Sequence, residues 1–142
     1  MNSLYVVNFC VLIIALASCN RVDPIPSEDV VKEKLLGKWQ YQRGTDETYT
    51  PAGVLVSLSE EIGTPDDSAI FKSNNLIYDY RKVGNEIIEE ITEYHIVNDS
   101  TINIDEEDYK IRKLTDTELY LYQEEFDARL NELDIRRLYL IR

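Results

Sequence analysis

Histidine, cysteine and glycine are scarce in this chain, and their scarcity argues against several kinds of chemistry. His95 is the only histidine and there are 2 cysteines, so His-based metal centres and nucleophilic triads lack the residues that they need. There are 5 glycines and no Gly-x-Gly-x-x-Gly or Walker pattern, which disfavours nucleotide binding through glycine-rich loops. We therefore predict that the protein is not an enzyme and that it holds no cofactor.

Basic residues are also few compared with acidic ones. Lys and Arg total 15, Asp and Glu total 27, and the formal net charge is −12. Residues 1–18 contain none of these four residue types, so the whole of this charge belongs to the rest of the chain. A domain this acidic repels phosphate backbones, so we predict no binding of nucleic acid. Accidental carboxylate pairs are common in such a chain and do not by themselves indicate a glycosidase-like site.

The chain begins with an apolar stretch. Leu4 to Ala17 carries no charged side chain, and it is shorter than the roughly 20 apolar residues that a membrane-spanning helix needs. It is typical of the apolar region of a secretory signal. The stretch ends in Leu16-Ala17-Ser18-Cys19, which resembles the lipobox of bacterial lipoproteins. The alternative is a buried N-terminal element with an ordinary core cysteine.

The lipobox resemblance implies that the mature protein begins at Cys19 and is held to a membrane by acyl chains on the Cys19 sulfur. Such chains contribute about 0.8 kcal/mol per buried CH₂. Pro24 and Pro26 favour an extended tether after the cysteine. Cys10 is removed with the signal peptide, so the folded part has no disulfide. We expect a protein of the cell envelope, in the outer membrane of a Gram-negative bacterium, on its periplasmic or surface face.

After the tether, the pattern predicts one short helix and then strands. Ser27 is a typical N-cap, Val31 and Leu35 lie on one apolar face, Gly37 ends the helix, and Trp39 begins a first strand. Segments rich in residues that favour strands follow at 69–72, 76–83, 86–97, 101–105, 109–114, 118–122 and 135–141. The polar connections between them are short enough to join antiparallel neighbours. We therefore predict an all-β, antiparallel, up-and-down meander.

Two segments admit more than one structure. Residues 44–68 hold Thr, Ser, Pro, Gly and acidic residues around an apolar piece, which fits either a strand or a long flexible loop over one mouth of a barrel. In residues 124–134, Phe126, Leu130 and Leu133 repeat at helical spacing. That spacing predicts a short helix or an ordered loop rather than a strand.

Two motifs carry a resemblance to a known family. Gly37-x-Trp39 at the start of the first strand resembles the lipocalin signature, in which the tryptophan closes the bottom of the barrel. The run Tyr109–Leu121 is similar to a strand, turn and strand found in lipocalin-like domains of bacterial (Bacteroidetes-type) cell-envelope lipoproteins. The matching pieces cover about 36–43 and 92–123. The resemblance implies a signal peptide (1–18), a lipidated cysteine with its tether (19–26) and a lipocalin-like β-barrel of about eight strands with a short N-terminal helix (27–142).

A barrel of about eight strands either is filled by side chains or encloses one small ligand. We predict a non-catalytic module that binds a small apolar or amphipathic ligand, and the alternative is a filled barrel that acts as a protein–protein interaction or accessory module. Tyrosine is a good strand residue in its own right, and its ring and hydroxyl also suit a ligand pocket. The candidate ligand-binding residues are Tyr78, Tyr80, Tyr94, Tyr109, Tyr120, Tyr122 and Tyr139. Trp39 is expected in the core.

Alternation does not identify the inward residues everywhere. In Leu119–Tyr122 and Leu138–Ile141 both faces are apolar, which predicts that something covers the outside of these strands. The candidates are the helix at 27–36, the segment 124–134 and a partner protein.

One acidic cluster, Asp105–Asp108, has the oxygen ligands that Ca²⁺ prefers. It lacks the ligand spacing of a dedicated calcium loop, and a charged turn is usually solvated. We therefore predict no metal site.

Overall fold

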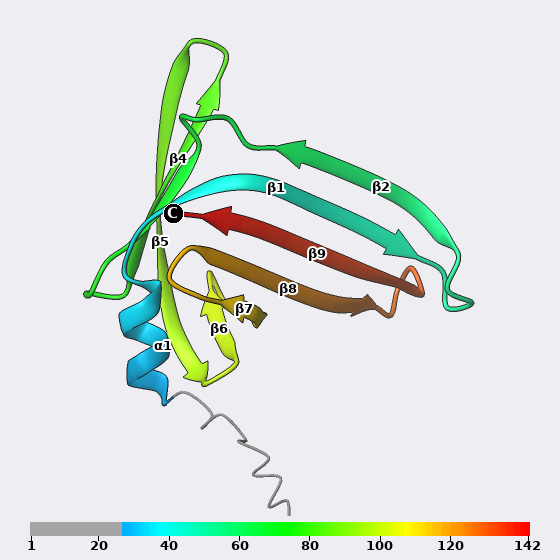
Figure 1. Cartoon of the computed structure of the whole chain (residues 1–142). Coiled ribbons are helices and arrows are strands. Elements are labelled where there is room, and N and C mark those ends of the chain that lie inside the picture. Colours follow the sequence, from blue (N-terminus) through cyan, green and yellow to red (C-terminus); the bar gives the residue numbers. More distant parts are fainter. Residues whose placement is uncertain (1–26) are drawn as a thin grey trace, which may run out of the picture.

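The computed structural model describes residues 27–142 (Figure 1). The predicted signal peptide, Cys19 and the tether lie outside the described residues. The elements are α1 (Glu28–Leu35), β1 (Gly37–Tyr49), β2 (Leu55–Ile62), β3 (Ser68–Phe71), β4 (Leu76–Val83), β5 (Glu86–Asn98), β6 (Thr101–Ile104), β7 (Glu107–Leu114), β8 (Glu118–Asp127) and β9 (Glu132–Ile141). None of the helical structure in this part of the chain is long and apolar enough to cross a membrane.

The strands close into a barrel. From β3 to β9 each strand pairs antiparallel with the next one along the chain, β9 pairs with β1, and β1 pairs with β3. This ring contains eight strands, because β2 lies beside it and not in it. The predicted fold class is confirmed: an all-β, antiparallel, up-and-down barrel of eight strands with a short N-terminal helix. Short polar turns between most neighbours explain why the pairing follows the chain order.

The strand β1 is longer than the barrel wall needs. Its first part, Gly37–Gln40, pairs with β3, whereas Arg43–Tyr49 pairs with β2 along the same edge. On its other edge, β1 pairs with β9 almost to its end. As a result β2, β1, β9 and β8 continue beyond the barrel as a four-stranded sheet, which we call the extension (Figure 1, right). Residues 44–68 are therefore mostly strand, with a loop at 63–67 between β2 and β3.

The prediction of a helix or ordered loop at 124–134 was wrong. The strand β8 continues to Asp127, and β9 starts at Glu132, so this segment is the tip of a hairpin. Phe126 pairs across the hairpin with Leu133, and Leu130 lies in the turn. The three apolar residues that repeat at helical spacing are therefore two partners that face each other across the hairpin and one residue of its turn. The Asp127 carboxylate stabilises the turn by accepting the backbone N–H groups that follow it.

The helix α1 closes one end of the barrel over the core. Trp39 is completely buried, as predicted, and its Nε1 donates to the Leu35 carbonyl at 2.7 Å. The guanidinium of Arg142 lies over the indole ring, 4.1 Å from its centroid, and donates to the Lys34 carbonyl at 2.7 Å. Gly37 begins β1 at φ +112°, a conformation that other residues adopt only with strain. The buried apolar core consists of Val31, Leu35, Trp39, Ala69, Phe71, Ile77, Tyr94, Ile102, Tyr109, Leu119, Leu121 and Leu140.

Two smaller expectations also change. Ser27 occupies the N-cap position, but its side chain makes no capping bond, and its carbonyl accepts the Val31 N–H at 3.1 Å instead. The helix α1 packs against β5 and β7, so neither it nor the 124–134 hairpin covers the outside of β8 and β9. There Tyr120 and Tyr139 stack on each other with ring centroids 4.4 Å apart. The two rings shield one another, which explains how both faces of these strands can be apolar.

Candidate functional site

A small chamber lies inside the barrel above the core. Its volume is about 120 Å³, and most of its wall is aliphatic or aromatic. Successive side chains of a strand point to opposite faces, so each strand contributes alternate residues to it. The lining consists of Tyr41, Ala69, Phe71, Ile77, Asp79, Thr92, Ile104, Tyr109, Leu121, Leu138 and Leu140.

A second, polar space of about 300 Å³ adjoins the chamber, and we call it the mouth. Tyr41, Tyr109 and Leu138 line both spaces, so these three residues form the boundary between the mouth and the chamber, which we call the collar. The mouth is lined by Tyr41, Gly44, Thr45, Asp46, Ser59, Glu61, Arg81, Tyr109, Arg136 and Leu138. The combined cavity is therefore amphipathic, with its apolar part inside and its charged part where the extension leaves the barrel.

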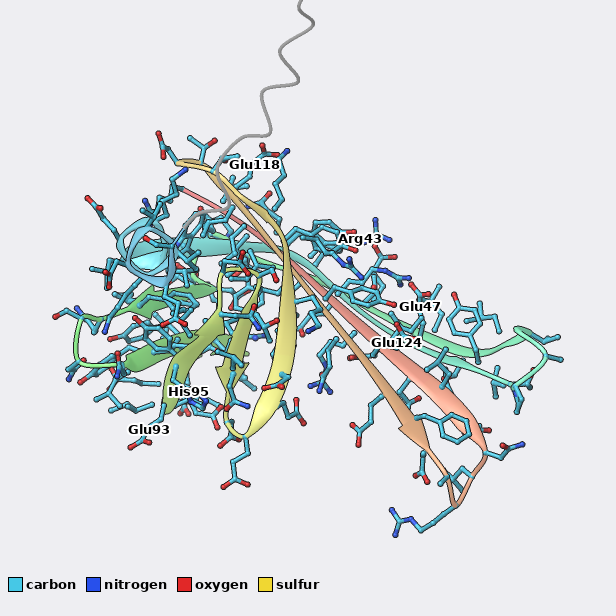
Figure 2. All side chains as sticks on the ribbon, turned by 90° about the horizontal axis from the view of Figure 1, so that it is seen from below. Arg43, Glu47, Glu93, His95, Glu118 and Glu124 are labelled. Atoms are coloured by element: carbon cyan, nitrogen blue, oxygen red, sulfur yellow. The ribbon has the colours of Figure 1, made fainter. Side chains whose placement is uncertain are left out.

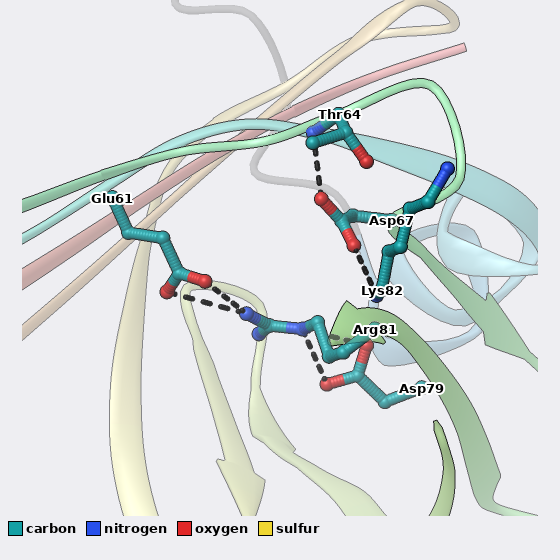
Figure 3. Close-up of polar contacts among 6 residues, drawn as sticks. All are labelled: Glu61, Thr64, Asp67, Asp79, Arg81 and Lys82. Carbon is teal, nitrogen blue, oxygen red and sulfur yellow. Dashed lines mark hydrogen bonds and ion pairs between the residues drawn. The ribbon is translucent and has the colours of Figure 1, made fainter. Parts of the chain in front are cut away.

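Arg81 of β4 holds one side of the mouth together (Figure 3). Its Nε donates to both carboxylate oxygens of Asp79 at 3.2 Å, and its Nη1 lies 3.3 Å from Oε1 of Glu61 on β2. The guanidinium also stacks on Tyr41, with Cζ 3.9 Å from the ring centroid. Burial alone would lower the pKa of Arg81, but the neighbouring carboxylates Asp79 and Glu61 act against burial and the pKa is raised, so this side chain stays charged.

The 63–67 loop is fastened beside the mouth by Asp67. This buried carboxylate accepts the backbone N–H of Thr64 at 2.6 Å and that of Lys82 at 2.7 Å (Figure 3). Burial alone would raise the pKa of Asp67, but these two donors outweigh it and hold the pKa below its ordinary value of 3.8. At Gly63 a Cβ would lie 2.3 Å from the Tyr41 carbonyl oxygen, so the loop approaches β1 too closely for any other residue.

Arg136 of β9 bridges the opposite side of the mouth. Its Nε donates to Asp46 on β1 at 2.7 Å, and its Nη1 lies 3.2 Å from both Glu107 and the hydroxyl of Tyr109 on β7. Tyr109 in turn donates to Glu107 at 3.0 Å. These contacts join three strands around the rim. Hydrogen bonding to Asp46 and Tyr109 raises the pKa of Arg136, so it too stays charged.

The collar tyrosines are neutral at physiological pH. Burial raises the pKa of Tyr41 to about 12, even though Arg81 opposes the shift. Burial is also the main reason that the pKa of Tyr109 is raised. Both hydroxyls therefore keep their protons, and each can donate and accept a hydrogen bond at the boundary between the chamber and the mouth.

The structure brings few of the predicted tyrosines to this cavity. Tyr109 lines it, whereas Tyr94 lies in the core, with its ring edge-on to Phe71 and its hydroxyl donating to the Lys72 carbonyl at 2.9 Å. The other five alternate with inward residues and so lie on the outer faces of their strands. The prediction that the seven tyrosines line one pocket is therefore corrected for six of them, which do not line the cavity: Tyr78, Tyr80, Tyr94, Tyr120, Tyr122 and Tyr139.

The remaining candidates for chemistry lie apart from the cavity. His95 is exposed on the outer face of β5, two residues from Glu93 (Figure 2). Asp105 and Glu106 form the β6–β7 turn, with φ values of +51° and +67°. Within residues 27–142, no group of three or more His, Cys, Asp or Glu side chains is placed to hold a metal ion.

Sequence reasoning missed Tyr41, Asp79, Arg81 and Arg136 as residues of the cavity. Tyr41 had a usable signal, because it lies two positions after the buried Trp39 and therefore faces the same side of β1. Asp79 and Arg81 share a face for the same reason. Nothing in the sequence connects Arg136 with β1 and β7, because that contact depends on which strands close the barrel.

Comparisons with known proteins add little to this description. No protein-family model matches the chain, and no curated protein matches it. Among solved structures, the chain is similar to a bovine odorant binding protein, a deswapped triple mutant, at 13% identity and a TM-score of 0.45. The similarity covers 77% of this chain and 74% of that one. The strand pairing of this chain itself defines the barrel.

Proposed function

We propose that this protein is a lipocalin-like binding module that takes up one small amphipathic molecule without chemical conversion. The observation that supports the proposal is the amphipathic cavity: an apolar chamber inside a closed barrel, entered through a charged mouth. Burial of an apolar group in the chamber drives binding, and the polar groups of the mouth orient the other end of the ligand.

The size of the chamber limits the ligand. Typical ligand pockets measure about 300–1,000 Å³, whereas the chamber alone measures about 120 Å³. An apolar cavity of about 150 Å³ is known to accommodate benzene. Because the chamber is somewhat smaller than that cavity, the apolar part of the ligand is at most a single ring or a short alkyl group, with the polar part in the mouth. A long-chain fatty acid does not fit.

Calorimetric titration with benzyl alcohol tests this function. Ala69 lines the chamber and is 5% exposed, so Ala69→Leu fills the space and lowers the affinity by at least about tenfold. Ala128→Leu is the matched control, because Ala128 is exposed in the β8–β9 turn. Leu138→Phe is a second filling variant for the case that Ala69→Leu does not fold. Absence of saturable heat with the wild type, or equal affinity in wild type and folded filling variant, contradicts the proposal.

We further propose that the barrel is anchored to the bacterial cell envelope through a lipid on Cys19, in the outer membrane. The lipobox-like Leu16-Ala17-Ser18-Cys19 and the apolar stretch before it support this. Labelling of cells with a clickable fatty acid tests it. The wild type and Cys10→Ser should carry the label and Cys19→Ser should not, and an unlabelled wild type contradicts the anchor.

The outer face of the extension supports a second candidate function, that of a protein–protein interaction module. Phe126, Leu133, Tyr49 and Ile135 border an apolar groove of about 480 Å³, and Leu58 of β2 nearby is 56% exposed. Exposed apolar patches of this kind often mark interaction sites. Sedimentation at increasing protein concentration tests self-association: Leu58→Lys should abolish it, and a monomer at every concentration contradicts association through a second copy.

A further inference from the structure

We propose that the ligand of this cavity carries a positive charge, and that it is a small organic amine whose ammonium group occupies the mouth. This inference rests on the proposed ligand-binding function and specifies the chemical class of the polar end. Three observations support it: the arrangement of charge around the mouth, the partners of the two arginines Arg81 and Arg136, and the aromatic residues of the collar.

Carboxylates outnumber cations in the group of charged side chains around the two arginines of the mouth. Arg81 is paired with Glu61 and Asp79, and Arg136 is paired with Asp46 and Glu107. Asp46 and Glu61 line the mouth itself and balance the two arginines there. Asp79, which lines the chamber, and Glu107 add two further carboxylates, so this group of six side chains has a net charge of −2. The whole chain has a formal charge of −12, so the field of the protein adds to this local excess.

An anionic ligand is disfavoured because each arginine is already flanked by two carboxylates, which repel a second anion. To bind Arg81, a ligand carboxylate would have to sit beside Asp79 and Glu61, which lie 3.2 Å and 3.3 Å from the guanidinium nitrogens. The ring of Tyr41 covers one face of the same guanidinium. Displacing an existing carboxylate would only replace one ion pair with another and release an unpaired negative charge into the mouth.

A cationic ligand finds acceptors that are still available. Each carboxylate has about four lone-pair positions, whereas Asp46 accepts one side-chain hydrogen bond, from Nε of Arg136. An ammonium group has three donors, which can reach the carboxylates at the mouth and the hydroxyl of Tyr109 in the collar. The ring of Tyr109 also attracts a cation through its face, whereas one face of Tyr41 is already occupied by Arg81. The apolar part of the amine remains in the chamber.

The experiment compares three probes that share one ring and differ in their head group: benzylamine, benzyl alcohol and benzoate. Affinities are measured by NMR titration at neutral pH and low salt, where benzylamine is protonated and benzoate is ionised. We expect benzylamine to bind about tenfold more tightly than benzoate, with benzyl alcohol between them. Raising the salt concentration should reduce the difference, because the mouth is partly exposed to solvent.

Charge variants locate the effect at the mouth. Glu61→Gln removes one carboxylate of the mouth and should weaken benzylamine binding about fivefold, and benzyl alcohol binding by clearly less. Glu60→Gln is the matched control, because Glu60 is its neighbour in β2 and pairs with Arg43 on the opposite face of the strand. Glu60→Gln should leave the affinity for all three probes unchanged.

The outcomes separate this inference from the function on which it rests. If benzyl alcohol binds in the chamber and benzoate binds as tightly as benzylamine, the head-group inference is overturned and the ligand-binding function stands. An equal effect of Glu60→Gln and Glu61→Gln on benzylamine overturns it as well, because a general loss of negative charge would then explain the preference. If none of the three probes binds, both proposals fail.

Discussion

Replacing Asp67 with alanine removes the buried carboxylate that joins the 63–67 loop to β4. In the folded protein this carboxylate accepts hydrogen bonds from the backbone N–H groups of Thr64 at 2.6 Å and Lys82 at 2.7 Å, and Asp67 is only 8% exposed. Hydrogen bonds to charged groups contribute about 1.5–3 kcal/mol each. Because water can reach part of the loop after the substitution, we use the lower end of this range for both bonds.

The free energy of unfolding should therefore fall by about 3 kcal/mol in Asp67→Ala. For a domain of this size the midpoint of thermal unfolding then drops on the order of 10 °C. Urea denaturation followed by circular dichroism measures the loss directly. Asp66→Ala is the control, because its carboxylate makes an exposed ion pair with Lys82 at 2.6 Å. Exposed pairs contribute about 0–1 kcal/mol.

The hydrogen bonds of Asp67 also predict that the stability of the fold depends on pH. The pKa of Asp67 is lowered in the folded state. Its contribution to the free energy of unfolding is therefore complete above the unfolded pKa of about 3.9. The contribution is lost as the pH falls from there through the lowered folded value. Asp67→Asn should therefore flatten the acid side of the stability profile below about pH 4. A loss of less than about 0.5 kcal/mol in Asp67→Ala, or equal losses in Asp66→Ala and Asp67→Ala, would refute this reasoning.

Two further substitutions test the loop and the closed end of the barrel. Gly63→Ala places a Cβ 2.3 Å from the Tyr41 carbonyl oxygen and should cost about 2 kcal/mol in urea denaturation. Gly44→Ala, whose Cβ meets its nearest side-chain atom at 3.5 Å, should change stability by less than about 0.5 kcal/mol, and equal costs for the two would contradict the close approach. Trp39→Phe leaves a gap in a fully buried site and removes the 2.7 Å bond to the Leu35 carbonyl. It should cost about 2–3 kcal/mol by the same assay, and a cost below about 1 kcal/mol would argue against the role of the indole.

Much of the barrel could be predicted from the sequence because each turn is determined by a few residues that are neighbours in the chain. Asn75 and Gly84 have φ values of +64° and +63° in tight connections, and such residues indicate a hairpin whatever the rest of the fold does. The helix before Gly37 and the burial of Trp39 also follow from short-range patterns. For these elements, the residues that determine the structure lie next to one another in the chain.

The cavity depended on long-range register, which the sequence does not specify. The pairing of β1 with β9 shifts by one residue between Tyr41 and Arg43. This shift decides that Leu138 and Arg136 face the cavity and that Tyr139 faces outward. In β8 and β9 both faces are apolar, so alternation could not tell which of their tyrosines face the interior. The hairpin at 124–134 was missed because three apolar residues imitated a helical period.

The central claim is that a small amphipathic molecule binds inside the barrel, and methyl NMR tests it most directly. Benzyl alcohol is titrated into protein with labelled Ile and Leu methyl groups, and the shifts are followed residue by residue. The account predicts saturable shifts at Ile77, Leu121 and Leu140, which line the chamber, and none at Leu58 or Leu130, which are exposed on the extension. Shifts confined to Leu58 and Leu130, or no saturable shift at any chamber methyl, would contradict it.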